Sequence, residues 1–267
     1  MIRLGPAGTP HGVSSTKDSM KYLAEEGLNA MEVQFVRGAR MKDSTAEKIG
    51  EEAKKYSIHL SIHAPYYINL NSEKDETIEK SKERIMKSSR LGDIMGAKII
   101  TVHAGYYSGM DSDEATEIIG DGVVECAEKI TDENLNVKIG LEQMGRKKSW
   151  GTLDEIKKVM DLTEVAVPVV DFAHYHARYD GILQSENDFR ELLDKFEDIY
   201  DGPLHSHFSS IEYNETGERE HMDLDAYDPD FRKLAPILKE KEYDITVICE
   251  TAELDRDSLK MKEILGL

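Results

Sequence analysis

Short apolar runs rich in valine and isoleucine recur along the chain about every 30 residues, the length of one strand-plus-helix unit. They begin near Ile2, Ala30, Ile58, Lys98, Val137, Ala166, Pro203 and Asp244, and segments with helical spacing separate them. Eight such units in 267 residues predict an α/β fold with a single domain over residues 1–267, closed as a (β/α)8 TIM barrel. A doubly wound sheet is the alternative architecture, but no GxGxxG segment follows the first strand.

Two helix boundaries are also marked in the sequence. Gly27 follows the helical pattern of Met20 and Leu23 and is typical of a residue that ends a helix. The segment from Thr152 to Glu155 has the capping-box pattern that opens a helix. Both features fall between expected strands, so they support the alternation of strands and helices.

The chain is strongly acidic, with a net charge of −19 from 34 basic and 53 acidic residues. This balance argues against a nucleic-acid partner, which usually meets a basic patch, unless a metal cluster reverses the sign locally. No stretch approaches the roughly 20 apolar residues of a transmembrane helix, and the amino terminus lacks the apolar core of a signal peptide. We therefore expect a soluble cytoplasmic protein. Cys126 and Cys249 have no CxxC partner and are expected to be buried core residues.

Six of the eight expected strands end in a histidine, an aspartate or a glutamate: His63, His103, Glu142, Asp171, His207 and Glu250. The carboxyl ends of barrel strands meet on one face, where barrel active sites lie. One such histidine alone is more often a hydrogen-bonded structural residue, but six ionisable side chains together require pairing or a cation. His174 and His221, in the loops that follow, add to the group. Imidazole and carboxylate without thiolate suit zinc or manganese.

Sequence blocks around these residues resemble those of the endonuclease IV family (AP endonuclease family 2), in the xylose isomerase-like TIM barrel superfamily. His63-Ala-Pro-Tyr-Tyr-Ile-Asn-Leu resembles the HxxYxINL block, His103-Ala-Gly the HPG block, and Leu141-Glu142 the (I/L)EN block with Gln143 in place of Asn. Asp171-Phe-Ala-His174 resembles DxxH, His207-Phe-Ser the HFS block, and Cys249-Glu250-Thr the LET block. The order, spacing and strand context of the six blocks match over nearly the whole chain.

The resemblance implies three metal sites, usually occupied by zinc. One ion would be held by His63, His103 and Glu142, and a second by Glu142, Asp171, His207 and Glu250, with Glu142 as the bridging and catalytic residue. A third ion would be held by His174 and His221. The family has an aspartate two residues before that last histidine, whereas this chain has Arg219, so Glu218, Glu220 or water would have to take its place. The expected content is two to three Zn²⁺ ions per chain, with Mn²⁺ as the other candidate.

By the same resemblance the chain would be a zinc-dependent apurinic/apyrimidinic endonuclease of base excision repair. It would hydrolyse the phosphodiester bond 5′ to abasic sites in double-stranded DNA, as a monomer and without a membrane. Tyr66 and Asn69 match family positions that enter the minor groove, and Arg37 and Arg40 lie in the loop after the second strand. These four are the expected substrate-binding residues, although both arginines are also compatible with a solvated loop. Trp150 is compatible either with stacking on DNA or with capping the barrel.

The other histidines have no match in the six blocks. His176 and His205 flank the cluster and are expected to orient its ligands. His11 and His59 are expected to be structural.

Two other functions stay open at this point. A metal-dependent sugar isomerase or epimerase of the same superfamily would need only Glu142, Asp171, His207 and Glu250, which hold one metal. It does not need the four further histidines, which favour the nuclease: His63, His103, His174 and His221. A non-catalytic metal-binding module that senses damaged DNA is the third interpretation. Turnover of an abasic duplex would separate all three, because one fold hosts many functions.

Overall fold

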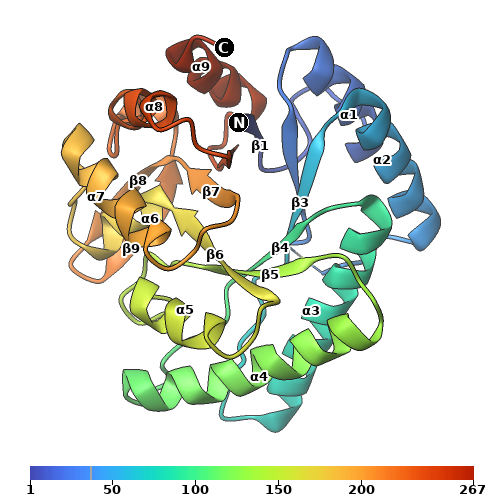
Figure 1. Cartoon of the computed structure of the whole chain (residues 1–267), viewed down its shortest axis with the longest axis vertical. Coiled ribbons are helices and arrows are strands. Elements are labelled where there is room, and N and C mark those ends of the chain that lie inside the picture. The colour runs from blue at the N-terminus through green and yellow to red at the C-terminus, as the bar shows by residue number, and fades with distance from the viewer. Residues whose placement is uncertain (37) are drawn as a thin grey trace.

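The computed structural model describes residues 1–36 and 38–267, and this part of the chain alternates strands and helices (Figure 1). The barrel strands are β1 (Ile2–Pro6), β2 (Ala30–Gln34), β3 (His59–His63), β4 (Ile99–Val102), β5 (Lys138–Glu142), β6 (Ala166–Asp171), β7 (Leu204–Phe208) and β10 (Ile245–Cys249). The helices are α1 (Thr16–Glu25), α2 (Asp43–Tyr56), α3 (Asp75–Met95), α4 (Ser112–Asp132), α5 (Leu153–Met160), α6 (Phe172–Arg178), α7 (Glu186–Glu197), α8 (Phe231–Glu240) and α9 (Asp255–Leu265), with a short 3-10 helix η1 (Leu224–Ala226). Each barrel strand begins within one residue of its predicted start.

The eight strands form one parallel sheet in the order β1-β10-β7-β6-β5-β4-β3-β2, and helices surround it (Figure 1). The two end strands meet through a bridge between Ala7 and Glu32 and through a hydrogen bond of 3.1 Å from Asn29 N to Leu4 O. Gly5 is needed at this seam because a Cβ atom there would lie 1.7 Å from the carbonyl oxygen of Ala30. The sheet is therefore a nearly closed barrel, and the TIM barrel prediction is confirmed.

Local signals in the sequence account for the helix ends. Gly27, with φ of 73°, follows α1, and the next amide, Leu28 N, donates to Leu23 O at 2.8 Å. Thr152 and Glu155 form both hydrogen bonds of a capping box at the start of α5. Cys126 and Cys249 are buried, as predicted. Within residues 1–36 and 38–267, no helix combines the length and the apolar character that crossing a bilayer would require.

A hairpin that the sequence patterns did not predict follows β7. It consists of the antiparallel strands β8 (Ser210–Asn214) and β9 (Gly217–Met222), where a loop was expected. Ile211 of β8 packs with Ala173 and Ala177 of α6 in a small apolar cluster separate from the main core. The hairpin carries His221 and so contributes to the site at the carboxyl ends of the strands.

Candidate metal centre

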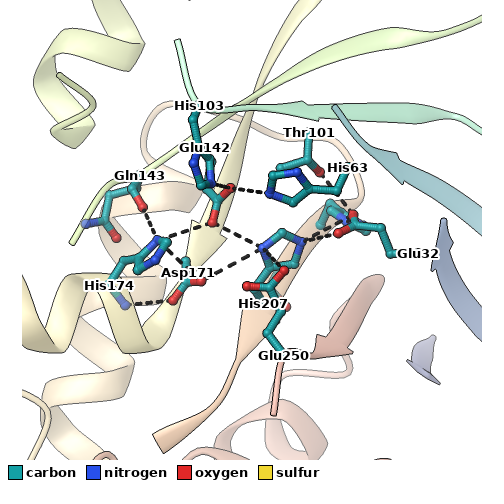
Figure 2. Close-up of polar contacts among 12 residues, drawn as sticks. Glu32, His63, Thr101, His103, Glu142, Gln143, Asp171, His174, His207 and Glu250 are labelled. Carbon is teal, nitrogen blue, oxygen red and sulfur yellow. Dashed lines mark hydrogen bonds and ion pairs between the residues drawn. The ribbon is translucent and has the colours of Figure 1, made fainter. Parts of the chain in front are cut away.

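The ligand-type side chains at the carboxyl ends of the strands lie together in three adjoining groups. Figure 2 shows the first two groups and His174 of the third. Within each group the candidate ligand atoms lie within 4.8 Å of one another. The first group is His63, His103 and Glu142; the second is Glu142, Asp171, His207 and Glu250; the third is His174, Glu218 and His221. The structure thus brings together all eight residues singled out in the sequence and adds Glu218. That they bind metal stays a prediction.

Glu142, at the end of β5, is the common member of the first two groups, and its side chain is fully buried. Its Oε2 atom lies 2.7 Å from His103 Nε2 and 3.4 Å from His63 Nε2. Its Oε1 atom lies 3.2 Å from both His207 Nδ1 and His174 Nδ1. The two oxygens therefore face different sets of histidines, which is the arrangement of a carboxylate able to bridge two cations.

Asp171 and Glu250 complete the second group. His207 Nδ1 lies 3.6 Å from Glu250 Oε1 and 3.8 Å from Asp171 Oδ2. Asp171 ends β6 and also caps α6, because its Oδ1 atom accepts a hydrogen bond of 2.7 Å from His174 N. This double role fixes the distance between the Asp171 and His174 side chains, and it explains why the two are three residues apart.

Glu218 enters the third group because of a β-bulge in the hairpin. Glu220 pairs with Glu212 and Glu218 pairs with Tyr213, so Arg219 is left as an extra residue. In a regular strand residues 219 and 221 would share a face. The extra residue instead turns Arg219 outward, where it donates to Glu212 at 2.8 Å, and places Glu218 Oε2 3.4 Å from His174 Nε2. Of the expected substitutes for the missing aspartate, Glu218 is therefore the one in position.

Burial and charge act in opposite directions on the carboxyl groups of the cluster. Burial alone would raise the pKa of Glu142, but His103 and His207 hold that pKa well below its ordinary range. Burial prevails at Asp171 and raises its pKa to about 7. Glu142 is therefore ionised at neutral pH, whereas Asp171 is close to its midpoint.

Several ligand histidines carry raised pKa values. Burial lowers the pKa of a histidine, but Glu142 overcomes burial at His63 and raises its pKa to about 9. Neighbouring carboxylates raise the pKa of His207 and of His174 well above the ordinary value, with Glu250 acting most strongly on His207 and Asp171 on His174. In contrast, burial lowers the pKa of His221. Without a cation, protons on three histidines would balance the buried carboxylates.

The polar atoms facing the centre of the cluster test whether the residues fit a metal. Within the described part of the chain, His63 Nε2, His103 Nε2, Glu142 Oε2 and Asp171 Oδ2 are buried and form no hydrogen bond of acceptable geometry. Buried polar atoms are nearly always hydrogen-bonded, so these four atoms, three in the first group and one in the second, indicate missing partners. Imidazole nitrogens and carboxylate oxygens are ligands of zinc and manganese, and the donor set fits such an ion.

A cavity of about 290 Å³ opens over the cluster and gives a substrate access to all three groups. Tyr66, Tyr106 and Arg146 line it beside the ligand side chains. Tyr66 is 44% exposed, and its ring centre lies 4.9 Å from that of His63. Asn69, in contrast, is engaged locally, because its Oδ1 atom accepts from Asn71 N at 3.2 Å.

The other residues singled out in the sequence lie away from this cavity. Arg40 lines a separate cavity of about 610 Å³ formed by residues of β2 and of the segments that follow β1 and β2. Arg37 lies outside the described residues. Trp150 is fully buried in the core and donates to Thr116 Oγ1 of α4 at 2.9 Å, so it is not free to stack on DNA.

The flanking histidines differ from one another. His205 Nε2 lies 3.0 Å from a carboxylate that sequence reasoning missed, Glu32 of β2. The expected orienting role of His176 is wrong, since its Nε2 atom lies 2.8 Å from Asp228, outside the cluster. His11 contacts Asp255, which agrees with a structural role. The only signal for Glu32 was an acidic residue within the apolar run Ala30-Met-Glu-Val.

Comparison with known proteins places this chain in a family. A family model described as the xylose isomerase-like TIM barrel matches residues 20–264. The chain belongs to that family. An uncharacterized protein from Methanocaldococcus jannaschii is 32% identical over 263 residues, which cover 97% of this chain and 95% of the relative. The endonuclease IV resemblance seen in the sequence therefore falls within the family to which the chain belongs.

Relatives with named activities are more distant. A "Probable endonuclease 4" of Listeria monocytogenes is 29% identical over 212 residues, which cover 74% of this chain and 69% of the relative. Among solved structures, endonuclease IV from Thermus thermophilus aligns with a TM-score of 0.78 at 19% identity, covering 99% of this chain and 97% of that one. A D-tagatose 3-epimerase-like protein aligns with a TM-score of 0.75 at 23% identity, covering 98% and 96%. At these identities the solved structures show the shared fold alone.

Proposed function

We propose that this chain is a zinc-dependent apurinic/apyrimidinic endonuclease that hydrolyses the phosphodiester bond 5′ to abasic sites in double-stranded DNA. The observation that carries the proposal is the position of Glu142 between two sets of histidines, with His63 and His103 at one oxygen and His174 and His207 at the other. A one-metal centre needs only the second group. The first and third groups add buried ligand side chains that would have no metal to bind in a one-metal enzyme.

The residues around the cavity suit a phosphodiester. When bound, two or three divalent cations would supply the positive charge that holds a phosphate and would activate water for hydrolysis. Arg146 adds a protein cation at the wall of the cavity, 3.7 Å from Glu218. Tyr66 and Tyr106 add partly exposed rings at the same opening. On a chain of net charge −19, an opening made positive by its bound metals is where a DNA backbone would bind.

The relatives support the nuclease, and they are also compatible with a second activity. The curated relatives named "Probable endonuclease 4" match up to three quarters of the chain, as in the Listeria monocytogenes protein at 74%. The second candidate is a metal-dependent sugar isomerase or epimerase, and one observation favours it. Glu142, Asp171, His207 and Glu250 form by themselves a complete group for a single ion. In that case the additional histidines would have another role.

Incision of a duplex with one abasic site, labelled at the 5′ end, tests the proposal. Metal-loaded protein should cut 5′ to the site and leave an undamaged duplex intact. Glu142→Gln should abolish incision with metals supplied. Glu155→Gln is the matched control, because Glu155 is equally buried but belongs to the capping box of α5. This control should retain incision.

The same preparation separates the alternatives. A single metal per chain and epimerisation of keto sugars, with no incision, would replace the nuclease by the isomerase. Tight binding of abasic DNA without turnover of either substrate would indicate a damage sensor. Two or three metals per chain with incision would support the endonuclease.

A further inference from the structure

Glu32 is a fully buried carboxylate inside the barrel that lies beside His207, on the side of the ring away from Asp171 (Figure 2). It lies in the middle of β2, and its oxygens accept hydrogen bonds from Ser61 Oγ at 3.0 Å and Thr101 Oγ1 at 3.1 Å. His205 Nε2 and Gln34 Nε2 lie 3.0 and 3.1 Å away. A buried charge is costly unless it is paired and hydrogen-bonded, and these donors satisfy it.

One more donor links Glu32 to the candidate metal centre. His207 Nε2 lies 3.1 Å from Glu32 Oε1 and 3.3 Å from Oε2, so the imidazole hydrogen on Nε2 is directed at the Glu32 carboxylate. The other ring nitrogen, Nδ1, faces Glu142, Asp171 and Glu250 on the opposite side (Figure 2). His207 therefore stands between one carboxylate that accepts its hydrogen and three that surround its second nitrogen.

This geometry selects one form of the imidazole. A neutral histidine carries its hydrogen on one nitrogen and a lone pair on the other, and the partner of the first decides which nitrogen can bind a metal. Carboxylates behind metal-ligating histidines fix the tautomer and the ring orientation, and they make the ligand more basic. With its hydrogen held on Nε2 by Glu32, His207 presents the Nδ1 lone pair to the second group.

We infer that Glu32 is a positioning residue of the metal centre, which holds His207 with its hydrogen on Nε2 and its Nδ1 atom turned toward Glu142, Asp171 and Glu250. The inference rests on the metal centre of the proposed function. Glu32 does not line the cavity over the cluster, and its oxygens are already engaged by two hydroxyls and two imidazoles. It therefore acts through His207 and does not contact substrate.

The competing interpretation is a separate cation held by Glu32, His205 and His207, whose ligand atoms also lie within 4.8 Å of one another. Ser61 and Thr101 argue against it, since their hydroxyl hydrogens occupy the carboxylate that such a cation would need. The two interpretations place the metal on opposite sides of the His207 ring. Locating the ion by anomalous diffraction in zinc-loaded crystals distinguishes them.

The test compares Glu32→Gln with wild type and with Glu155→Gln. Each metal-free protein is titrated with Co²⁺ and Zn²⁺ against a chelator, and the visible absorption of the bound Co²⁺ is recorded. Glu32→Gln should bind one metal about 10- to 100-fold more weakly, the usual loss when an outer carboxylate is removed, with an altered Co²⁺ spectrum. Glu155→Gln, in which a buried carboxylate outside the cluster is changed, should match wild type in both measurements.

The outcomes separate this inference from the proposed function. A wild-type protein that binds no metal would overturn the proposed function, whereas equal affinity and equal Co²⁺ spectra in wild type and Glu32→Gln would overturn only the positioning role. If Glu32→Gln does not fold, the tautomer of His207 in zinc-loaded wild type decides, measured by ¹⁵N NMR of the imidazole. Hydrogen on Nε2 supports the inference. Hydrogen on Nδ1, or an ion found between Glu32 and His207, refutes it.

Discussion

Metal binding to this protein should release protons from the ligand histidines. The perturbation is the addition of Zn²⁺ to metal-free protein at pH 7. His63, His174 and His207 have raised pKa values in the metal-free state, to about 9 for His63 and well above the ordinary value for the other two. All three are therefore expected to be protonated at pH 7. A histidine must be neutral at the nitrogen that binds a metal, so each of these protons has to leave.

One such histidine belongs to each of the three groups. Filling all three groups should then release about three protons per chain, because metal ligands must be deprotonated. Asp171, with a pKa raised by burial to about 7, adds a further fraction of a proton. A one-metal isomerase centre built from the second group would displace only the proton on His207 and the fraction on Asp171. The count therefore distinguishes a multi-metal centre from a one-metal centre.

The sign of the pH dependence follows from the same protons. Lowering the pH favours the protonated histidines and so weakens metal binding, by about tenfold per pH unit for a site that loses one proton. The dependence on pH should level off above about pH 9 at the first group, since His63 is then already neutral in the metal-free protein. Between pH 6 and 8 the affinity of that group should keep rising.

Isothermal titration calorimetry in buffers of different ionisation enthalpy measures the release directly. The slope of the observed enthalpy against the ionisation enthalpy of the buffer is the number of protons exchanged. Glu155→Gln should give the wild-type slope, because Glu155 caps α5 and touches none of the ligands. Binding of two or more ions with release of less than one proton would show that the charge balance of the cluster has been misread.

Four further results are expected. Glu142→Gln should abolish incision while the circular dichroism spectrum and most of the thermal stability persist, since the change removes a charge that faces the ligand histidines and keeps the size of the side chain. Turnover near the wild-type rate would contradict the bridging role. Glu218→Gln should lower the metal content by one ion, whereas Arg219→Ala, on the outer face of the same bulge, should leave it unchanged. Elemental analysis measures both, and an ion lost from Arg219→Ala but not from Glu218→Gln would contradict this assignment. Arg40→Ala should reduce the salt dependence of abasic-duplex binding by about 0.9 in the logarithmic slope, and superimposable curves would mean that its loop is merely solvated. Trp150→Ala should cost about 3–5 kcal/mol of unfolding free energy in denaturant titrations, as for a fully buried aromatic residue, and a loss below 1 kcal/mol would be inconsistent with its burial.

The barrel and most of the candidate ligands could be predicted from the sequence because both depend on local patterns. Each strand is a short apolar run, and a residue at its carboxyl end reaches the common face once the strands are parallel. His63, Glu142 and Asp171 could be assigned to one site on this ground alone. Predicting that these residues share one site did not require knowing which strands are neighbours.

Glu32 and Glu218 could not be assigned in this way. Glu32 meets His205 and His207 only across the closed barrel, at sequence separations of 173 and 175 residues. Its burial without an adjacent basic residue was nevertheless a usable signal, since a buried acid must find partners elsewhere. The position of Glu218 depends on a shift of register inside a hairpin. One extra residue reverses which side chains of the strand face the site, and no composition rule reveals that residue.

The hairpin β8–β9 has a further consequence for how the molecule responds to metal. It lies outside the barrel ladder and is held by local contacts, among them Ile211 packed on α6 and a bridge between Gly217 and Arg146, and two-stranded hairpins have little stability of their own in water. Glu218 and His221 lie on this hairpin, and their partner His174 lies on α6. An ion in the third group would thus be a noncovalent cross-link between two segments far apart in the chain. Chelation should then release the hairpin to limited proteolysis near residues 214–217 while the barrel stays folded, so that the third ion would govern the shape of the opening as well as its charge.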